Sequence, residues 1–304
     1  MGPAGDALDR LLTASPSLRD ALPGIERAAA TDAAVLILGE PGTGRSTLAR
    51  ALHAASGRHD GPLVEMDPGV VPAALFEGDL FGHRAGAFTG ADQDVAGRIE
   101  RAEGGTLVLD HVEELPVRVQ PKLLRVLAER RFAPLGGLER SADVRFVALG
   151  PPDLAERAQR GSFRADLFYR LDVLSYLLPP LRRRVDDLSQ LLDAVLADLA
   201  ARLDRPKPIL ASSALDWMLA YAWPGNLRQM RNVLERAMVV ADGDVLDPEP
   251  PGGVERRPPS LREVEKAHLL KVLAYTRGHQ GRAAEILGIS RKALWEKRRR
   301  LGIP

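Results

Sequence analysis

The feature that most constrains the fold is a glycine-rich loop between an apolar run, residues 33–38, and a segment with helical spacing. The loop has the form G-x-x-x-x-G-x-[ST], in which backbone N–H groups converge on phosphate oxygens and the helix N-terminus adds partial positive charge. A phosphate-binding site at the end of a buried strand is therefore predicted. The residues assigned to it are Gly39, Glu40, Pro41, Gly42, Thr43, Gly44, Arg45, Ser46 and Thr47.

Three more short apolar runs follow, at residues 63–66, 106–109 and 144–149, and longer stretches with helical spacing separate them. Short buried strands that alternate with helices imply a mostly parallel sheet with right-handed crossovers. After Pro180 the pattern changes, because residues 187–203 place their leucines along one helical face. The predicted fold class is α/β, a P-loop core with a parallel sheet followed by a helical subdomain.

Composition excludes several classes of protein. The chain has 304 residues, 45% hydrophobic and 27% charged, which is typical of a globular protein and excludes wholesale disorder. No apolar run approaches the roughly 18 residues of a membrane span, and the first ten residues lack the order of a signal peptide. The lack of cysteine excludes disulfides and cysteine nucleophiles. We expect a cytoplasmic protein with no membrane partner.

Charge is distributed unevenly along the chain. Residues 261–304 contain 11 Lys and Arg and 4 Asp and Glu, a net charge of +7, so the other 260 residues carry −6 of the total of +1. The segment 242–260 is dense in Pro, Gly and charge, which is typical of an interdomain linker. A basic tail on an acidic body suggests a polyanionic partner, the alternative being a solvated basic helix.

Two side chains near the loop are predicted to hold Mg²⁺. Asp110 places a carboxylate at the end of the run 106–109, and Ser46 supplies a hydroxyl. His111 can act as a base, but its ring nitrogen reaches a different place from a carboxylate oxygen. Arg45 stands where the loop motif has a lysine, and a planar guanidinium is a poor substitute for a compact ammonium. Asp110 and His111 are the candidate catalytic residues of the core.

The end of the chain predicts helix, tight turn and helix. Gly288 permits the turn, and Ser290 is a natural N-cap for the second helix. Cations remain for the outside of that helix, which can enter the DNA major groove with its first residues near base edges and other cations on phosphates. The candidate DNA-binding residues are Ser290, Arg291, Lys292, Lys297 and Arg298.

A loop with one aromatic residue lies at residues 86–91, between the apolar runs 63–66 and 106–109. Small residues around a single Phe predict a mobile loop with an apolar tip, suited to a contact that forms and releases. The alternative is a glycine-rich turn with Phe88 tucked into the core. The loop consists of Gly86, Ala87, Phe88, Thr89, Gly90 and Ala91.

With the sequence GAFTGA at 86–91, the chain resembles the sigma-54-dependent enhancer-binding proteins, bacterial transcription activators of the AAA+ ATPase superfamily. The resemblance extends from about residue 17 to residue 304. It implies that the GAFTGA loop contacts sigma-54 and that ATP and Mg²⁺ bind at the subunit junctions of a homo-oligomer, from dimer to hexamer. It also implies that the tail is a Fis-type helix-turn-helix domain that binds enhancer DNA.

The resemblance assigns roles to single arginines. Arg164 and Arg170 match arginine fingers that reach a neighbouring subunit's γ-phosphate and so become candidate catalytic residues, and Arg228 matches the nucleotide-sensing arginine of the lid. The segment 261–275 matches a dimer-forming helix. The implied domains are a short N-terminal extension at 1–16, an AAA+ α/β core at 17–180, a helical lid at 181–241, a linker at 242–260 and the Fis-type domain at 261–304.

Four departures from the family pattern cluster at the chemistry. They are Arg45 for lysine, His111 for the glutamate that orients water, Asp67 for the asparagine that holds this glutamate, and Gly150-Pro151 for a polar pair that senses the γ-phosphate. Neither Gly nor Pro offers a side-chain hydrogen bond. We expect the subunit to bind nucleotide but to hydrolyse it slowly or not at all alone.

The favoured function is an ATP-binding transcription regulator that remodels the closed complex of sigma-54 RNA polymerase. One alternative is a hydrolysis-deficient DNA-binding subunit that joins an active homologue in a mixed ring. The other is a nucleotide-responsive DNA-binding repressor, against which the GAFTGA loop argues. Only about 16 residues precede the core, so the family's N-terminal sensory domain is expected to be absent. Regulation is then expected from a partner protein, expression level or mixed assembly.

Overall fold

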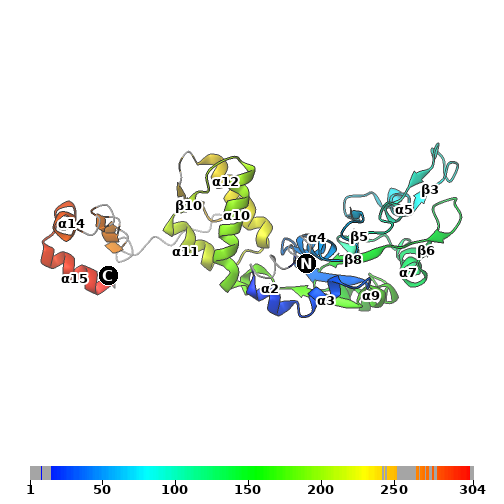
Figure 1. Ribbon diagram of the computed structural model, residues 1–304, viewed down its shortest axis with the longest axis horizontal. Coiled ribbons are helices and arrows are strands. Elements are labelled where there is room, and N and C mark those ends of the chain that lie inside the picture. The colour runs from blue at the N-terminus through cyan, green and yellow to red at the C-terminus, as the bar shows by residue number, and fades with distance from the viewer. Residues whose placement is uncertain are drawn as a thin grey trace. The chain divides into compact units, whose positions relative to one another are not determined.

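Five parallel strands form the main sheet of the computed structural model, in the order β2-β5-β8-β1-β9 (Figure 1). The strands β5 and β8 are buried along their whole length, which requires cover on both faces of the sheet. The predicted α/β class with a parallel sheet is confirmed. The bounds are β1 Val35–Gly39, β2 Leu63–Met66, β5 Thr106–Leu109, β8 Arg145–Gly150 and β9 Leu174–Leu178.

The chain divides into two compact units, Met1–Glu249, which contains the sheet, and Pro250–Pro304. None of the helices in the described part of the chain combines the length and apolar character needed to span a membrane. The structure describes residues 8, 15–241, 243, 245–251, 265–266, 268–270, 272–273, 276 and 279–301.

The edge strand β9 is not among the predicted apolar runs. Among the described strands it pairs only with β1. Tyr176 and Leu178 are buried, and Leu177 is half exposed. A five-residue apolar segment followed by prolines fits a helical turn as well as a strand, so its pattern did not identify it. The segment is extended because it pairs with β1, which would otherwise leave a free edge of the sheet.

Neighbouring residues of β1 contribute to two different cores. Leu36 belongs to the cluster that contains Phe76, and Ile37 to the cluster that contains Leu48. Because successive side chains of a strand point to opposite faces, helices must cover both sides of the sheet. These helices are α2 Pro16–Ala21, α3 Ile25–Ala29, α4 Arg45–Ala54, α5 Ala73–Phe81, α6 Arg98–Arg101, α7 Gln120–Glu129, α8 Leu154–Gln159 and α9 Ala165–Leu171, with a 3-10 turn η1 at Val112–Glu114.

Two short hairpins lie side by side at one end of the core. The first pairs β3 (Gly82–His83) with β4 (Val95–Ala96), and the second pairs β6 (Arg131–Phe132) with β7 (Arg140–Ser141). Leu135, at the tip of the second hairpin, donates its N–H to the Gly82 carbonyl at 2.9 Å and accepts from Arg84 at 3.0 Å. The two hairpins therefore move as one element unless these hydrogen bonds break.

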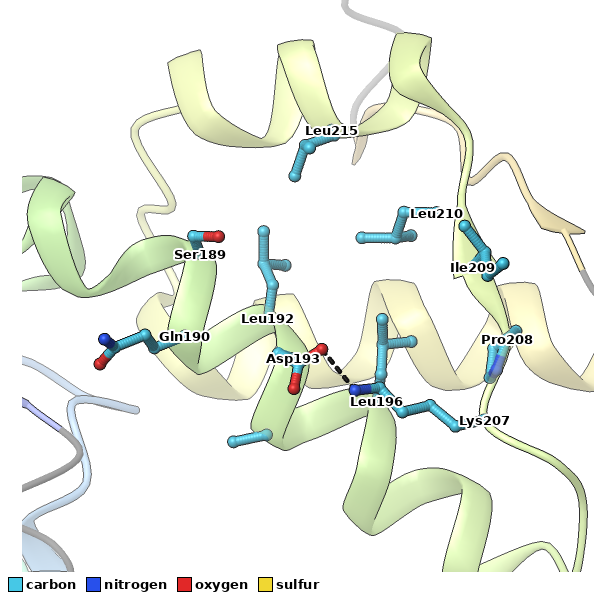
Figure 2. Close-up of a pocket in the computed structure, with 11 residues that line it drawn as sticks. Ser189, Gln190, Leu192, Asp193, Leu196, Lys207, Pro208, Ile209, Leu210 and Leu215 are labelled. Carbon is cyan, nitrogen blue, oxygen red and sulfur yellow. Dashed lines mark hydrogen bonds and ion pairs between the residues drawn. The ribbon is translucent and has the colours of Figure 1, made fainter. Parts of the chain in front are cut away.

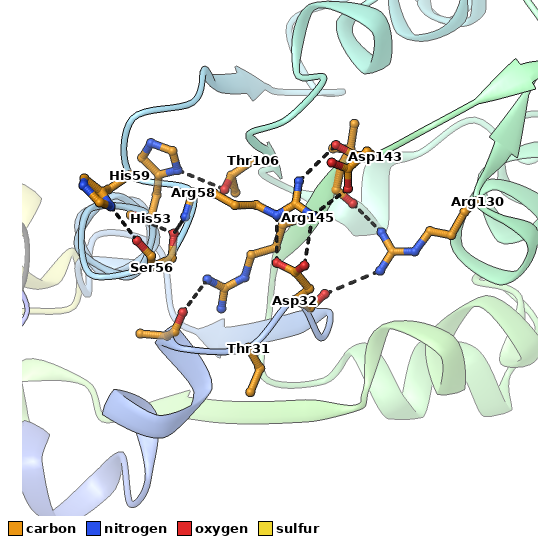
Figure 3. Close-up of polar contacts among 12 residues, drawn as sticks. Thr31, Asp32, His53, Ser56, Arg58, His59, Thr106, Arg130, Asp143 and Arg145 are labelled. Atoms are coloured by element: carbon orange, nitrogen blue, oxygen red, sulfur yellow. Dashed lines mark hydrogen bonds and ion pairs between the residues drawn. The ribbon is translucent and has the colours of Figure 1, made fainter.

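A network of arginines and carboxylates holds the strand beginnings (Figure 3). Arg58 donates to Asp32 at 2.7 and 2.9 Å and to Asp143 at 2.6 Å, which joins the chain before β1 to the chain before β8. Arg145 is 1% exposed and donates to the two carbonyls that end α3. Burial lowers the pKa of Arg145, and the nearby Asp32 opposes this. The network fixes the amino ends of the strands, whereas the glycine-rich loop follows β1 at their carboxyl ends.

The lid packs around its own core, in which Trp223 is fully buried and donates from its indole N–H to the Met218 carbonyl at 2.9 Å. The long helices of the lid confirm the predicted change of pattern after the sheet. Its elements are the 3-10 turns η2 Leu181–Arg183 and η3 Val185–Asp187, the helices α10 Leu188–Arg202, α11 Ser212–Ala220 and α12 Asn226–Val240, and the strands β10 Ile209–Leu210 and β11 Val245–Leu246.

The predicted linker at 242–260 starts too early. Val245 and Leu246 form β11, which pairs in parallel with β10, and Leu246 is 1% exposed in the lid core. Two apolar residues among prolines and charges are too few to show a period, so the composition of the segment concealed them. Residues 252–260 lie outside the described part of the chain.

The lid contains a cavity of about 760 Å³ between α10 and residues 207–210 (Figure 2). Leu192, Leu196 and Leu215 line it, and an ion pair between Asp193 and Lys207 closes one side. None of its lining residues belongs to the glycine-rich loop, so this cavity is separate from the candidate phosphate site.

The second unit contains α14 (Gln280–Ile286) and α15 (Arg291–Leu301), and Gly288 between them has a φ of +66°. This confirms the predicted helix-turn-helix. The predicted helix at 261–275 falls partly outside the described residues, of which 265–266, 268–270 and 272–273 are helical. The core of the unit consists of Leu269, Val272, Ala283, Ala284, Leu294 and Leu301.

Candidate functional site

The glycine-rich loop between β1 and α4 has the geometry of an anion cradle. Gly42 and Gly44 have φ values of +80° and +104°, the left-handed region that favours glycine. The Thr43 hydroxyl donates to the Glu40 carbonyl at 2.8 Å and closes the loop. The helix α4 begins at Arg45, so the unpaired N–H groups of its first turn follow the loop directly. The loop therefore offers backbone donors to a phosphate.

Arg45 lies beneath the loop, with a side chain only 6% exposed. Its Nη1 donates to the Gly150 carbonyl at 2.6 Å and to the Gly39 carbonyl at 3.1 Å, and its Nη2 lies 3.6 Å from Asp110 Oδ1. One guanidinium thus joins the carboxyl ends of β8, β1 and β5. Arg45 would have to leave these partners to meet a phosphate.

Ser46 and Asp110, the predicted Mg²⁺ ligands, contact each other, since Ser46 Oγ donates to Asp110 Oδ2 at 3.2 Å. A cavity of about 370 Å³ opens beside them and is also lined by Asp67. Hydroxyl and carboxylate oxygens are the ligands that hard divalent cations prefer. The structure brings this pair together at the end of β5.

His111 and Asp67, two of the four departures from the family pattern, contact each other. His111 Nδ1 lies 3.1 Å from Asp67 Oδ2 and 3.7 Å from Asp110 Oδ1, and its backbone is left-handed with a φ of +48°. An imidazole that donates from Nδ1 to a carboxylate carries its acceptor on Nε2. The ring is thus oriented by the side chain that replaces the asparagine.

Glu113, which no sequence motif indicates, also belongs to this site. Its Oε2 is buried without a hydrogen-bond partner among the described residues. Burial raises the pKa of Glu113, against the attraction of His111, Arg45 and Arg157. The signal that could have found it is its place on the turn directly after Asp110.

The lid touches the loop through backbone and side-chain hydrogen bonds. Asn226 Nδ2 donates to the Pro41 carbonyl at 3.0 Å, and Arg182 forms a bidentate ion pair with Glu40 at 2.6 and 2.8 Å. Hydrogen bonds from Arg182 lower the pKa of Glu40, with a smaller contribution from Asn226 and against its partial burial. Glu40 therefore acts as a fixed anionic anchor for the lid.

Arg228, the predicted nucleotide-sensing residue, is exposed and lies next to the loop. A Cβ on Gly42 would come within 3.0 Å of Arg228 Cβ and within 2.5 Å of the Gly225 carbonyl. Only glycine at position 42 permits this approach of the lid. The structure brings Arg228 and the loop residues together.

The two predicted arginine fingers differ in their surroundings. Arg164 forms an exposed ion pair with Asp166 at 2.7 Å. Arg170 donates to the Leu127 carbonyl at 3.0 and 3.2 Å, near the end of α7. Within one subunit neither arginine contacts the glycine-rich loop. Arg164 can exchange its partner Asp166 more readily, because that ion pair is exposed to water.

The GAFTGA loop, residues 86–91, joins β3 to β4. Its ends meet through a hydrogen bond from Gly86 N to the Ala91 carbonyl at 2.8 Å. The Phe88 ring is 48% exposed and its centroid lies 4.9 Å from that of His83. The apolar tip is thus presented to solvent, which excludes the alternative of a core-packed Phe88.

In the second unit, Ser290 Oγ accepts the Ala293 N–H at 3.1 Å, the predicted N-cap of α15. Arg291 and Lys292 are exposed on the first turn of that helix. Lys297 forms an ion pair with Glu265 of the preceding helical segment, so its ammonium is turned toward the unit itself. Arg298 is half buried. The first three predicted residues are exposed, with the Arg291 guanidinium lying near Gly281 of α14, and the last two are half buried.

The residues present fit a bound nucleotide and a divalent cation. The glycine conformations and the Ser46–Asp110 pair suit phosphates and a cation. The described residues contain no cluster of three His, Asp or Glu that could hold a metal alone, so further ligands would come from the nucleotide and water. His111 is engaged with Asp67 where a carboxylate would orient water.

Comparison with known proteins gives consistent results along the chain. Residues 11–176 match the Sigma-54 interaction domain, residues 182–250 the AAA+ ATPase lid domain, and residues 260–301 the family described as bacterial regulatory protein, Fis family. Regulatory protein AtoC of Escherichia coli is 39% identical over 312 residues, which cover 96% of this chain and 68% of AtoC.

Two further comparisons agree with these matches. The alginate biosynthesis transcriptional regulatory protein AlgB of Pseudomonas aeruginosa is 39% identical over 97% of this chain and 68% of its own length. The crystal structure of NtrX from Brucella abortus in complex with ADP has a TM-score of 0.70 at 31% identity, over 95% of this chain and 68% of that one. The chain therefore belongs to the sigma-54 interaction domain family and is a sigma-54-dependent transcription regulator with an AAA+ core, a lid and a Fis-type helix-turn-helix.

Proposed function

We propose that this regulator binds ATP with Mg²⁺ in the cradle between core and lid and hydrolyses it slowly when alone. The loop residues 39–47 hold the phosphates, Ser46 and Asp110 hold Mg²⁺, and Arg228 contacts the nucleotide from the lid. NtrX of Brucella abortus has been crystallised with ADP and with ATP, which supports a nucleotide in this fold. The Mg²⁺ ion supplies positive charge to the phosphates when it is bound.

The single observation that carries the proposal is the buried position of Arg45. Its two hydrogen bonds to strand-end carbonyls are each worth about 0.5 to 1.5 kcal/mol net, and they would be lost if the guanidinium moved to a phosphate. Catalysis depends on charge that is already in place in the transition state. An arginine held elsewhere therefore permits binding by the backbone cradle but contributes little to the rate.

The residues that would surround the attacking water also support slow hydrolysis. His111 is oriented by Asp67, and Gly150 and Pro151 offer no side-chain hydrogen bond at the end of β8. Position 111 thus lacks the carboxylate that orients water in the family pattern, and positions 150 and 151 lack the polar side chains that sense the γ-phosphate. We infer that slow turnover is a property of the whole site.

The test compares the native protein with the double variant Arg45→Lys, His111→Glu. We expect saturable calorimetric binding of ATP with Mg²⁺ by both proteins and a turnover at least about tenfold higher for the variant. Arg50→Lys serves as the matched control, because Arg50 is an exposed arginine of the same helix that pairs with Glu65. Native turnover equal to that of the double variant would refute slow hydrolysis, and no saturable heat would remove the nucleotide.

We further propose that the subunits assemble, from dimer to hexamer, with Arg164 and Arg170 facing a neighbour's nucleotide. The exposed Arg164–Asp166 pair is worth little in water and can be exchanged for a phosphate. This favours a second candidate function, a subunit of a mixed ring that supplies Arg164 to an active homologue. The test mixes this protein with an active homologue whose own arginine fingers have been removed. Restored ATP turnover supports the mixed ring. Equal restoration by an Arg164→Ala variant contradicts it.

The partners follow the domain division proposed from the sequence, a core at 17–180, a lid at 181–241, here extended through β11, and a DNA-binding domain at 261–304. The GAFTGA loop contacts sigma-54 through Phe88 and Thr89, and the helix-turn-helix binds enhancer DNA. We place the protein in the cytoplasm because RNA polymerase is its partner. A Phe88→Ala variant that retains full sigma-54 binding would contradict the loop assignment.

A further inference from the structure

The outward face of α15 carries a tryptophan among cations. Trp295 is 54% exposed, and Arg291, Lys292 and Arg299 on the same face are exposed as well. Residues four apart lie on one side of a helix, so Arg291, Trp295 and Arg299 form a stripe, which we call the recognition stripe. A large aromatic side chain in this position needs an explanation, because indole is rarely left in water without a partner surface.

Trp295 is not among the core residues in the described part of the second unit. That core is completed from α15 by Leu294 and Leu301, which are 1% and 4% exposed. The indole instead packs against its own helix, where the Arg299 guanidinium lies 5.5 Å from the ring centroid. Such a cation–π pair, worth about 0.5 to 1 kcal/mol when exposed, holds the ring in one orientation on the surface.

The charges around the stripe distinguish its centre from its flanks. Lys297 and Arg300 both pair with Glu265, so this side of α15 faces its own unit. Glu296 is exposed beside Trp295 on the outward face. A carboxylate is repelled by phosphates but can accept from a base edge. The middle of the outward face therefore suits the floor of a groove, with cations at both ends for the phosphate walls.

We propose that Trp295 is a specificity-determining residue that contacts the C5-methyl group of a thymine in the major groove of the bound duplex. This rests on the DNA binding proposed above. The indole ring is apolar except for one N–H, and the thymine methyl is the apolar feature that the major groove offers. Arg291 and Arg299, one turn to either side, place their charges on phosphates or guanine edges.

Cation–phosphate contacts and the indole–methyl contact differ in their salt dependence. Each cation on a phosphate releases counterions and contributes about 0.9 to the slope of log K against log salt. A contact between an indole and a methyl group contributes to affinity but not to that slope. Loss of one buried methyl group corresponds to about a fourfold loss of affinity, from about 0.8 kcal/mol per carbon.

The experiment starts from a duplex that the full chain selects from a random-sequence pool. Affinities are measured by fluorescence anisotropy over a salt series for the native chain, Trp295→Ala, Trp295→Phe and Arg299→Ala. Each thymine of the duplex is replaced in turn by uracil, which removes only the methyl group. Ile286→Ala is the matched control, since Ile286 is 51% exposed in the same unit but lies on α14.

We expect Trp295→Ala to bind the selected duplex about tenfold more weakly with an unchanged salt slope, and Arg299→Ala to lower the slope by about 0.9. One uracil replacement should weaken the native chain about fourfold and leave Trp295→Ala unaffected. Trp295→Phe should keep part of this sensitivity.

Three results would overturn the proposal. The first is that Trp295→Ala binds the duplex with full affinity. The second is that uracil replacement weakens the native chain and Trp295→Ala equally. The third is that sedimentation shows a changed oligomeric state of Trp295→Ala, which would account for its weak binding. If the native chain selects no duplex at all, the DNA-binding function fails instead, so the two failures are distinguishable.

Discussion

Three residues form a buried ionic cluster where the chain enters the lid. Arg184 and Asp187 are 2% and 0% exposed and pair at 3.1 Å, and Ser15, the N-cap of α2, contacts both side chains. Burial raises the pKa of Asp187, but hydrogen bonds from Ser15, Arg184 and Ser17 outweigh this, and its pKa is lowered. The cluster joins the first described helix of the core to the start of the lid.

We predict that Asp187→Asn lowers the free energy of unfolding by about 3 to 5 kcal/mol, because Arg184 would be left as an uncompensated buried charge. Ser15→Ala should cost about 1 kcal/mol, the worth of one cap. Urea denaturation at neutral pH measures both. A carboxylate whose pKa is lower in the native state than in the unfolded state stabilises the native protein at pH values above its unfolded pKa. The stability difference between the native protein and Asp187→Asn should therefore shrink as the pH falls through the native pKa of Asp187. Equal stability of Asp187→Asn and the native protein would contradict this role.

Glu113 gives a second prediction at the residue scale, with the opposite sign. Its pKa is raised by burial, so the native state binds the proton more tightly than the unfolded state, and stability falls as the pH rises above the unfolded value. Glu113→Gln removes the charge and should stabilise by about 1 kcal/mol at pH 8. The gain should vanish near pH 4. Thermal melts at both pH values test it, with exposed Glu114→Gln as the control.

At the scale of elements, the two adjacent hairpins decide how the GAFTGA loop is presented. Gly136, in the second hairpin, has a φ of +70°, and a Cβ there would lie 2.9 Å from Ala87 Cβ in the loop. The second hairpin thus touches the loop at a position where any larger residue must displace it. The shape of the loop depends on a neighbour more than 40 residues away in the chain.

We predict that Gly136→Ala weakens sigma-54 binding several-fold and leaves ATP affinity unchanged. Gly161→Ala is the matched control, because Gly161 has a φ of +79° with open space around it. Both variants carry the strain of a left-handed alanine, about 1 to 2 kcal/mol, but only the first displaces Ala87. Sigma-54 affinity is measured by surface plasmon resonance, and an equal loss in both variants would assign the effect to strain alone.

At the scale of the first unit, Asn226 couples the lid to the core. It is fully buried with a φ of +52°, its Oδ1 accepts the Leu181 N–H at 2.7 Å, and its Nδ2 donates to the Pro41 carbonyl at 3.0 Å. One side chain therefore holds the beginning of the lid with one atom and the glycine-rich loop with another. Movement of the lid must break or carry these bonds.

We predict that Asn226→Ala lowers the free energy of unfolding by about 2 to 3 kcal/mol, because it leaves buried partners unpaired and strains the backbone. Asn226→Asp retains the acceptor for Leu181 but loses the donor for Pro41. It should keep the lid folded, as judged by the fluorescence of Trp217 and Trp223, while hydrogen exchange at residues 40–43 accelerates. Unchanged exchange in Asn226→Asp would show that the Arg182–Glu40 ion pair and the hydrogen bond from Leu227 N to the Gly42 carbonyl hold the lid without this donor.

Local sequence patterns were sufficient to predict the class of fold, the position of the glycine-rich loop, the GAFTGA turn and the capped helix of the second unit. Each of these depends on local chemistry: runs of buried residues, glycines with positive φ such as Gly42, and the Ser290 cap. The edge strand β9 was not recognised because an apolar segment followed by prolines fits a helical turn as well as a strand, and β11 was not recognised because two residues are too few to show a period. Their conformation follows from a partner strand far away in the chain.

The contacts between the altered residues of the site depend on the packing of the folded chain. Arg45 and His111 could be identified as departures from position alone, but their partners, Gly150 and Asp67, come from other strands. The burial of Glu113 also follows from packing, since no local pattern reveals it. The ion pair between Lys297 and Glu265 is likewise a contact between segments far apart in the chain. Which donor meets which acceptor across strands and helices depends on packing, and packing is a property of the whole folded unit.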